Sequence, residues 1–166
     1  MYALIIKNLV MDTNIQTQLN IRQAVPFFMV TDIERSLKFY VGGLGFEMKN
    51  KWTPHNKIEW CCLQREGAAI MLQEYKTELA KKIQGRLGKG VCICFICDDA
   101  LKLYKEFISK SLSPAEPFVG NGMWDVAIND PDGYILRFES LTDVPEETMY
   151  SQWQKSNLKP EQLFAP

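Results

Sequence analysis

Two runs of apolar residues, 24–30 and 91–96, divide the hydrophobic pattern of the chain into halves. Such nearly continuous runs are typical of strands that are covered on both faces. Each run is followed by apolar positions at helical spacing, which are Ile33, Leu37 and Tyr40 in the first half and Leu101, Tyr104, Ile108 and Leu112 in the second. The pattern therefore predicts a buried strand followed by an amphipathic helix, twice.

The residues at the helix ends indicate where these helices begin and stop. Thr31 and Glu34 form a capping box, in which each side chain can bond the backbone amide of the other residue. The glycine pair at 42–43 predicts the end of this helix. Asp98 or Asp99 is expected to cap the second helix.

Shorter strands fill the rest of each half. Alternation and turn signals predict them at residues 46–52, 57–64, 68–74, 114–119, 123–129 and 134–139. In the last strand one face carries Tyr134, Leu136 and Phe138, and the other carries Ile135, Arg137 and Glu139. Residues 129–133 predict a turn before it, because Pro131 presets the backbone, Asp130 and Asp132 can bond local amides, and Gly133 accepts a positive φ.

The two halves are spaced as copies of one unit. Asp32 and Asp99 are 67 residues apart, and Gly67 and Gly133 are 66 apart, a near-constant offset that is typical of a tandem repeat. We therefore predict one α+β domain built from two βαβββ modules. The expected boundaries are 1–21 for an N-terminal extension, 22–76 for the first module, 77–90 for a helical linker, 91–141 for the second module and 142–166 for a C-terminal helix and tail.

Composition narrows the class of partner. The chain has 166 residues, of which 46% are hydrophobic and 23% charged, and its 19 basic and 20 acidic side chains leave a net charge of -1. No basic run or stripe is present, so the composition argues against nucleic acid and in favour of a small molecule or a second copy of the chain. Residues 1–7 have no basic start and are too short an apolar run for a signal peptide or a membrane span, so we expect a cytoplasmic protein.

Five cysteines raise the question of a metal or a disulfide. Their odd number, in an expected reducing compartment, favours free thiols that pack as small apolar side chains. Cys92, Cys94 and Cys97 have the spacing of a zinc knuckle. The residues between them predict a strand, however, whereas a zinc knuckle needs a tight turn.

Several segments together resemble the vicinal oxygen chelate superfamily, which includes glyoxalase I, extradiol dioxygenases, fosfomycin-resistance enzymes and bleomycin-resistance proteins. They are Val-Thr-Asp-Ile-Glu-Arg-Ser-Leu-Lys-Phe-Tyr at 30–40, Leu-Gly-Phe at 44–46, and Asp-Pro-Asp-Gly at 130–133 before a strand that ends in Glu139. The resemblance spans residues 22–141, and Gly-Met-Trp at 122–124 is most similar to the bleomycin-resistance branch. It implies a curved, cup-like mixed sheet with helices on its outer face, and a homodimer.

The resemblance also implies where a metal would be held. In metal-using members each module supplies one ligand from its first strand and one from its last, and the corresponding positions here are Val25, Gln73, Cys92 and Glu139. Valine cannot ligate, and a thiolate matches an oxygen-rich site poorly. We therefore favour no metal, with Gln73 and Glu139 as ligands if Mn, Ni, Zn or Fe binds. His55 lies in a proline-containing turn and is interpreted as a solvent-exposed side chain rather than a ligand or base.

The expected ligand site is the inside of the cup. Strand alternation places Val25, Phe27 and Met29 together, as it does Ile135, Arg137 and Glu139, and Trp60 and Trp124 could offer flat surfaces. The predicted ligand-binding residues are Val25, Phe27, Trp60, Gln73, Cys92, Trp124, Arg137 and Glu139. The favoured function is metal-free binding of a small, partly apolar molecule, which such pockets suit. The alternative is a divalent-metal-dependent lyase, transferase or dioxygenase with Glu139 as the catalytic residue.

Overall fold

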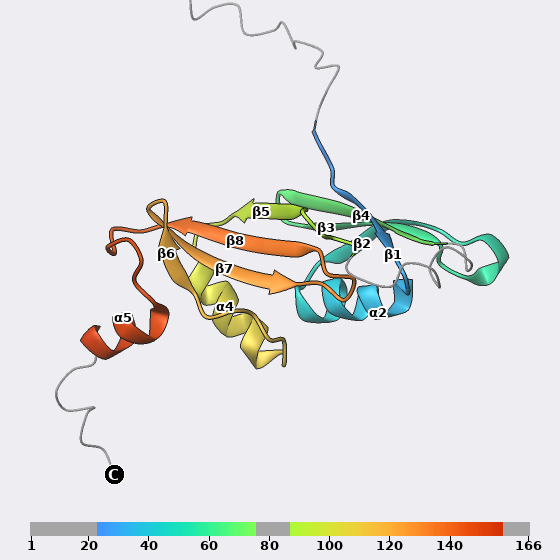
Figure 1. Ribbon diagram of the computed structural model, residues 1–166. Coiled ribbons are helices and arrows are strands. Elements are labelled where there is room, and N and C mark those ends of the chain that lie inside the picture. The colour runs from blue at the N-terminus through green and yellow to red at the C-terminus, as the bar shows by residue number, and fades with distance from the viewer. Residues whose placement is uncertain (1–22, 76–86, 158–166) are drawn as a thin grey trace, which may run out of the picture.

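The computed structural model describes residues 23–75 and 87–157 of the chain (Figure 1). The first half contains β1 (Phe27–Val30), α2 (Ile33–Leu37), the π-helix η1 (Lys38–Gly43), β2 (Glu47–Trp52), the 3-10 turn η2 (Pro54–Asn56), β3 (Trp60–Arg65) and β4 (Ala68–Glu74). The second half contains β5 (Cys92–Ile96), α4 (Ala100–Ser109), β6 (Phe118–Gly120), β7 (Met123–Asn129), β8 (Ile135–Leu141) and α5 (Tyr150–Asn157). The expectations for residues 1–21 and for most of the linker, 77–86, lie outside the described residues.

The strands form two four-stranded mixed sheets with the same topology. Their orders are β1-β4-β3-β2 and β5-β8-β7-β6, and in each sheet the first and last strands of a module pair in parallel. Phe28 lies opposite Leu72 in the first sheet, and Phe95 lies opposite Phe138 in the second, which reproduces the offsets of 67 and 66 residues. The α+β class and the two βαβββ modules are thus confirmed.

Among the described residues, helices cover one face of each sheet. Helices α2 and α4 lie on the same side of the molecule, beneath the sheets in Figure 1. The strand residues that face them are buried and form the core with Tyr40 and Phe107; they include Phe28, Val30, Leu63, Ile70, Leu72, Val126, Leu136 and Phe138. No described helix covers the opposite face, which we call the open face.

Both helices begin at an aspartate, although the first cap differs from the prediction. Asp32, not Thr31, is the N-cap of α2, and its carboxylate accepts a hydrogen bond from the Arg35 amide at 3.0 Å. The Thr31 hydroxyl instead donates to Asp132 of the second module at 2.5 Å. A capping box is a local pattern, and here a charged acceptor distant in sequence takes the hydroxyl. The N-cap of α4 is Asp99, which is one of the two residues predicted for this position.

The apolar stripe of α4 is displaced from its predicted position. Ile108 is 49% exposed, whereas Phe107 is fully buried and its ring lies 5.0 Å from that of Phe138. The buried stripe therefore begins at Ala100, directly after the cap, and continues at i+3, i+4 and i+7. The strand predicted at 114–119 is also shorter, and β6 begins only at Phe118 because Pro114 and Pro117 cannot donate to a ladder.

The turn between β7 and β8 forms as predicted and packs against its surroundings. Gly133 has φ +88°, and the Asp130 carboxylate accepts from the amide of Asp132 at 2.9 Å and from that of Tyr134 at 2.8 Å. A Cβ on Gly88 would lie 2.3 Å from the Cα of Tyr134, so only glycine fits against this turn. None of the helices in residues 23–75 and 87–157 is long and apolar enough to cross a membrane.

Candidate functional site on the open face

In the first sheet, the open face carries apolar side chains around Gln73. Gln73 on β4 lies opposite Met29 on β1 and opposite Trp60 on β3, so these three residues form a row across the sheet. Trp52 lies opposite Trp60 on the next strand. Phe27 and Trp52 are each 51% exposed, which is unusual for aromatic side chains of this size.

In the second sheet, the corresponding row is centred on Glu139. Glu139 lies between Ile96 on β5 and Asp125 on β7. Ile96 is 74% exposed and Leu141, two residues beyond Glu139, is 86% exposed. The polar groups of this sheet are therefore surrounded by apolar side chains that no described residue covers.

The open face of the second sheet carries a charge pair between two of its strands. Arg137 forms its ion pair with Asp125 rather than with its strand neighbour Glu139. Arg137 lies diagonally across the β7–β8 ladder from Asp125, a position that a long side chain reaches. The Asp125 side chain is buried, and within the described residues its Oδ1 atom is the buried side-chain oxygen without a hydrogen-bond partner. Such an acceptor is costly to leave unpaired.

Glu139 has a weaker protein partner. The Cys94 thiol is positioned to donate to Glu139 Oε1, with 3.7 Å between the two atoms. Burial, and after it the negative charge of Glu139, raises the pKa of the Cys94 thiol above its ordinary value. Cys94 therefore stays protonated at neutral pH and remains a weak donor, which leaves most of the acceptor capacity of Glu139 free.

The structure places most, but not all, of the predicted ligand-binding residues on the open face, in two groups. Gln73, Trp60 and Phe27 share the open face of the first sheet, and Cys92, Arg137 and Glu139 share that of the second. Val25 precedes β1 and is half-buried.

Trp124 is the exception, since it lies on the helix side of β7 and is only 5% exposed. Its ring packs against Tyr150 and Trp153 of α5. The strand position predicted by alternation was right. Trp124 is buried because α5 packs against its side of the strand. The alternation of residues within β7 does not reveal this packing.

The four implied metal positions are divided between the two sheets, and two of them hold side chains that suit an oxygen-rich site poorly. Gln73 and Glu139 belong to different sheets, and the two first-strand positions hold Val25 and the thiol of Cys92. Within residues 23–75 and 87–157, no three His, Cys, Asp or Glu side chains are placed to hold a metal ion. His55 is exposed in η2 with φ +57°.

Asp125 is the residue that sequence reasoning missed. The signal was present, because in the predicted strand 123–129 the aspartate alternates with Trp124 and Val126, which are buried on the opposite face. Its significance depends on the register with β8, which places Asp125 directly opposite Glu139. Two carboxylates and one guanidinium therefore share one part of the open face.

Two βαβββ modules with an uncovered sheet face define a vicinal oxygen chelate fold. The chain belongs to the glyoxalase/bleomycin resistance protein/dioxygenase superfamily, whose family model matches residues 21–138. No curated protein sequence matches the chain significantly.

Solved structures of similar fold include antibiotic-binding proteins. A bleomycin-binding protein complexed with bleomycin has a TM-score of 0.57 and 22% identity, over 74% of this chain and 100% of that one. A bleomycin resistance determinant encoded on the transposon Tn5 has a TM-score of 0.59 and 22% identity, over 73% and 98%. TnmS3, an antibiotic-binding protein from Streptomyces sp. CB03234, has a TM-score of 0.56 and 18% identity, over 75% and 99%. At these identities the likeness concerns the fold, which hosts several chemistries.

Proposed function

We propose that the protein is a cytoplasmic, metal-free binding protein that holds a small, partly apolar molecule against the open face. The observation that carries this proposal is the partly exposed Glu139 carboxylate, whose partner among the described residues is the weak donor Cys94, and which lies beside the exposed side chain of Ile96. A ligand with an N–H or O–H group could donate a hydrogen bond to Glu139. The bleomycin-binding protein of similar fold supports a small-molecule ligand.

The apolar surroundings of this group support a cleft between two copies of the chain. Phe27, Trp52, Ile96 and Leu141 are all large and exposed, and we infer that they contribute to an interaction surface, which exposed apolar side chains mark when they lie together. A second copy placed over the face would remove this surface from water and enclose the polar groups. Enclosure also strengthens the interactions of Asp125 and Glu139 with a ligand, because the local dielectric falls.

The polar groups favour a ligand that carries a positive charge or several donors. Arg137 neutralises Asp125, so Glu139 leaves this cluster with one uncompensated negative charge. Trp60 lies on the same face of the first sheet and could stack on an aromatic ring or a cation. The ligand class is therefore an aromatic or partly apolar cation.

The test combines oligomeric state, metal content and ligand titration. Sedimentation equilibrium should give a dimer, and protein purified without chelator or polyhistidine tag should contain much less than one metal ion per chain. Calorimetric titration with metal-free bleomycin and with acriflavine, an aromatic cation, should show binding of at least one probe. Asp125→Asn and Glu139→Gln should each weaken that binding by about tenfold, the effect of losing roughly 1.4 kcal/mol.

Glu34→Gln is the matched control, because it removes one acidic charge from an exposed position on α2. It should leave the affinity unchanged. A monomer that binds neither probe would contradict the proposal, as would metal near one ion per chain. Equal weakening by all three substitutions would indicate non-specific charge attraction instead of a site.

A further inference from the structure

The structure contains two junctions at which a turn of one module contacts the other module. The β7–β8 turn packs against β1 and α2, and the β3–β4 turn packs against β5 and α4. The offsets of 67 and 66 residues make Phe95 the counterpart of Phe28, and Ile96 that of Met29. They make Ala68 the counterpart of Tyr134.

At the β7–β8 turn, the junction is filled by an aromatic ring. Tyr134 stacks on Phe28 with ring centroids 4.1 Å apart and an interplanar angle of 10°. Its hydroxyl donates to the backbone carbonyl of Met29 at 3.1 Å. The phenol side chain of Tyr134 therefore occupies this junction as a bound ligand would.

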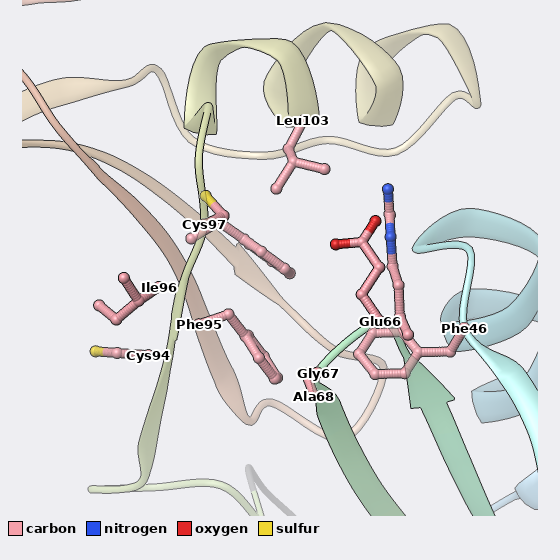
Figure 2. Close-up of a pocket in the computed structure, with 11 residues that line it drawn as sticks. Phe46, Glu66, Gly67, Ala68, Cys94, Phe95, Ile96, Cys97 and Leu103 are labelled. Atoms are coloured by element: carbon pink, nitrogen blue, oxygen red, sulfur yellow. The ribbon is translucent and has the colours of Figure 1, made fainter. Parts of the chain in front are cut away.

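At the β3–β4 turn, alanine replaces this tyrosine and a cavity of about 370 Å³ occupies the junction. The cavity is lined by Ala68, Phe46, Phe95, Leu103 and Phe138, among others. Figure 2 shows Phe46, Phe95 and Leu103 pointing into it, whereas the side chains of Cys94 and Ile96 point away. This volume lies within the range of roughly 300–1,000 Å³ for small-molecule sites.

The cavity also has a counterpart of the Met29 carbonyl, which accepts the hydrogen bond from the Tyr134 hydroxyl. This counterpart is the carbonyl of Ile96. Pro26 and Val30 bond β4 through their carbonyls, so the carbonyl of Met29 faces the free edge of β1. On either side of β5, the carbonyl of Val91 and the amide of Cys97 bond β8, so the backbone groups of Ile96 face the free edge of β5 in the same way. The ring of Phe95 lies 5.1 Å from that of Phe138 and 6.1 Å from that of Phe46, at interplanar angles of 20° and 65°, and it lines the cavity together with both of them.

We propose that this cavity binds a small phenol, an aromatic ring with one hydroxyl. The ring stacks on Phe95 and the hydroxyl donates to the carbonyl of Ile96, as the side chain of Tyr134 does in the other junction. The ligand is not an anion, because Glu66 lines the cavity and the neighbouring Arg65 is already bonded to the Leu44 carbonyl and to Glu106. The site lies on the helix side of the sheets and is separate from the open face.

The probe is p-cresol, which reproduces the side chain of tyrosine, and the measurement is amide chemical-shift mapping on the full chain. Titration of p-cresol should shift the amides of Ala68 and of residues 95–97 with saturation. Toluene, which lacks the hydroxyl, should bind at least about fivefold more weakly, since one hydrogen bond contributes about 1 kcal/mol. Ala68→Tyr should abolish p-cresol binding and raise the melting temperature, because its ring fills the cavity.

The matched control is Ala69→Tyr. Ala69 is the next residue of β4 and faces the opposite side of the sheet, so this variant should bind p-cresol as the unmodified chain does. The proposal is overturned if p-cresol causes no saturable shift near the cavity, if toluene binds equally well, or if Ala68→Tyr still binds. Binding of acriflavine or bleomycin at the open face is read from different amides, so failure at one site is distinguishable from failure at the other.

Discussion

The β7–β8 turn and the β3–β4 turn hold equivalent places in the two modules but join them in different ways. The β7–β8 turn inserts Tyr134 between the modules and buries Asp130 and Asp132. The β3–β4 turn consists of Glu66 and Gly67, both exposed, and is followed by Ala68. One junction is therefore filled with side chains and the other encloses a cavity.

The polar contacts of the two junctions differ as well. Asp132 accepts from the amide and hydroxyl of Thr31 and from the Arg35 guanidinium at 3.1 Å. Its counterpart in the first module is Glu66, and the counterpart of Thr31 is Asp98. Glu66 and Asp98 border the same hollow, and two carboxylates cannot form the bonds that a carboxylate and a hydroxyl form.

This difference shows that equivalent junctions of a duplicated unit can have different roles. The β7–β8 junction fixes the modules relative to each other through a long-range network. The β3–β4 junction has an edge-to-face contact between Phe46 and Phe95, with ring centroids 6.1 Å apart, and a partly exposed ion pair between Arg65 and Glu106 at 2.9 Å. Exposed ion pairs contribute little to stability. The second junction is thereby left available for a ligand.

The largest effect should follow from emptying the filled junction. Tyr134→Ala removes the ring that stacks on Phe28 and should lower the free energy of unfolding by about 3–5 kcal/mol, as aromatic truncations in cores do. Urea denaturation followed by circular dichroism measures this. Tyr134→Phe, which removes only the hydroxyl bond to Met29, should cost about 1 kcal/mol. Equal, small losses for both variants would mean that this junction is no better packed than the other.

A smaller effect is expected from the buried contact between Tyr40 and Asp130. The Tyr40 hydroxyl donates to Asp130 Oδ2 at 3.0 Å, and Tyr40 is fully buried. Tyr40→Phe leaves a buried carboxylate oxygen without its donor and should cost about 2 kcal/mol at neutral pH. Tyr104→Phe is the control, because the Tyr104 hydroxyl bonds none of the described residues, and it should cost much less.

The loss in Tyr40→Phe should also depend on pH. Burial raises the pKa of Asp130 above its ordinary value of 3.8, and the Tyr40 hydroxyl lowers it part of the way back. Without the hydroxyl the folded-state pKa rises further, so the unfolded chain releases this proton more readily than the folded one. The variant should therefore lose stability relative to the unmodified chain as pH rises through the raised folded-state pKa of Asp130. The two chains should differ least at low pH, where this carboxyl is protonated in both. A loss that is constant between pH 3 and pH 7 would contradict this assignment.

The sequence predicts the elements of this fold better than the contacts between modules. Alternation located β4 and β7 at their observed bounds, and it separated the packing face of β8, with Leu136 and Phe138, from the open face with Glu139. These features depend on neighbours along the chain or on one repeated spacing. The repeat itself followed from the positions of two aspartates and two glycines.

Contacts between residues distant in sequence could not be predicted in the same way. The partner of Arg137 is Asp125, and the partner of Thr31 is Asp132, 101 residues away. Both pairs are set by register and by the docking of the modules, which alternation does not determine. The cavity beside Ala68 could not be predicted for the same reason. It depends on how the modules dock, and Ala68 is significant only because its counterpart Tyr134 fills the other junction.

The smallest effect should come from making the second junction resemble the first. Asp98→Thr removes one of the two carboxylates that border this hollow and supplies a hydroxyl at the position that Thr31 holds in the other junction. It should raise the free energy of unfolding by about 0.5–1 kcal/mol, the range for one hydrogen bond and one relieved like-charge contact. Part of the gain should disappear in 1 M NaCl, where the screening length is about 3 Å. Asp143→Thr changes the net charge equally at an exposed position and should have no effect. If the free energy of unfolding rises equally in both variants, the change is explained by net charge rather than by the junction. In that case the replacement of a threonine by Asp98 at this position does not affect stability.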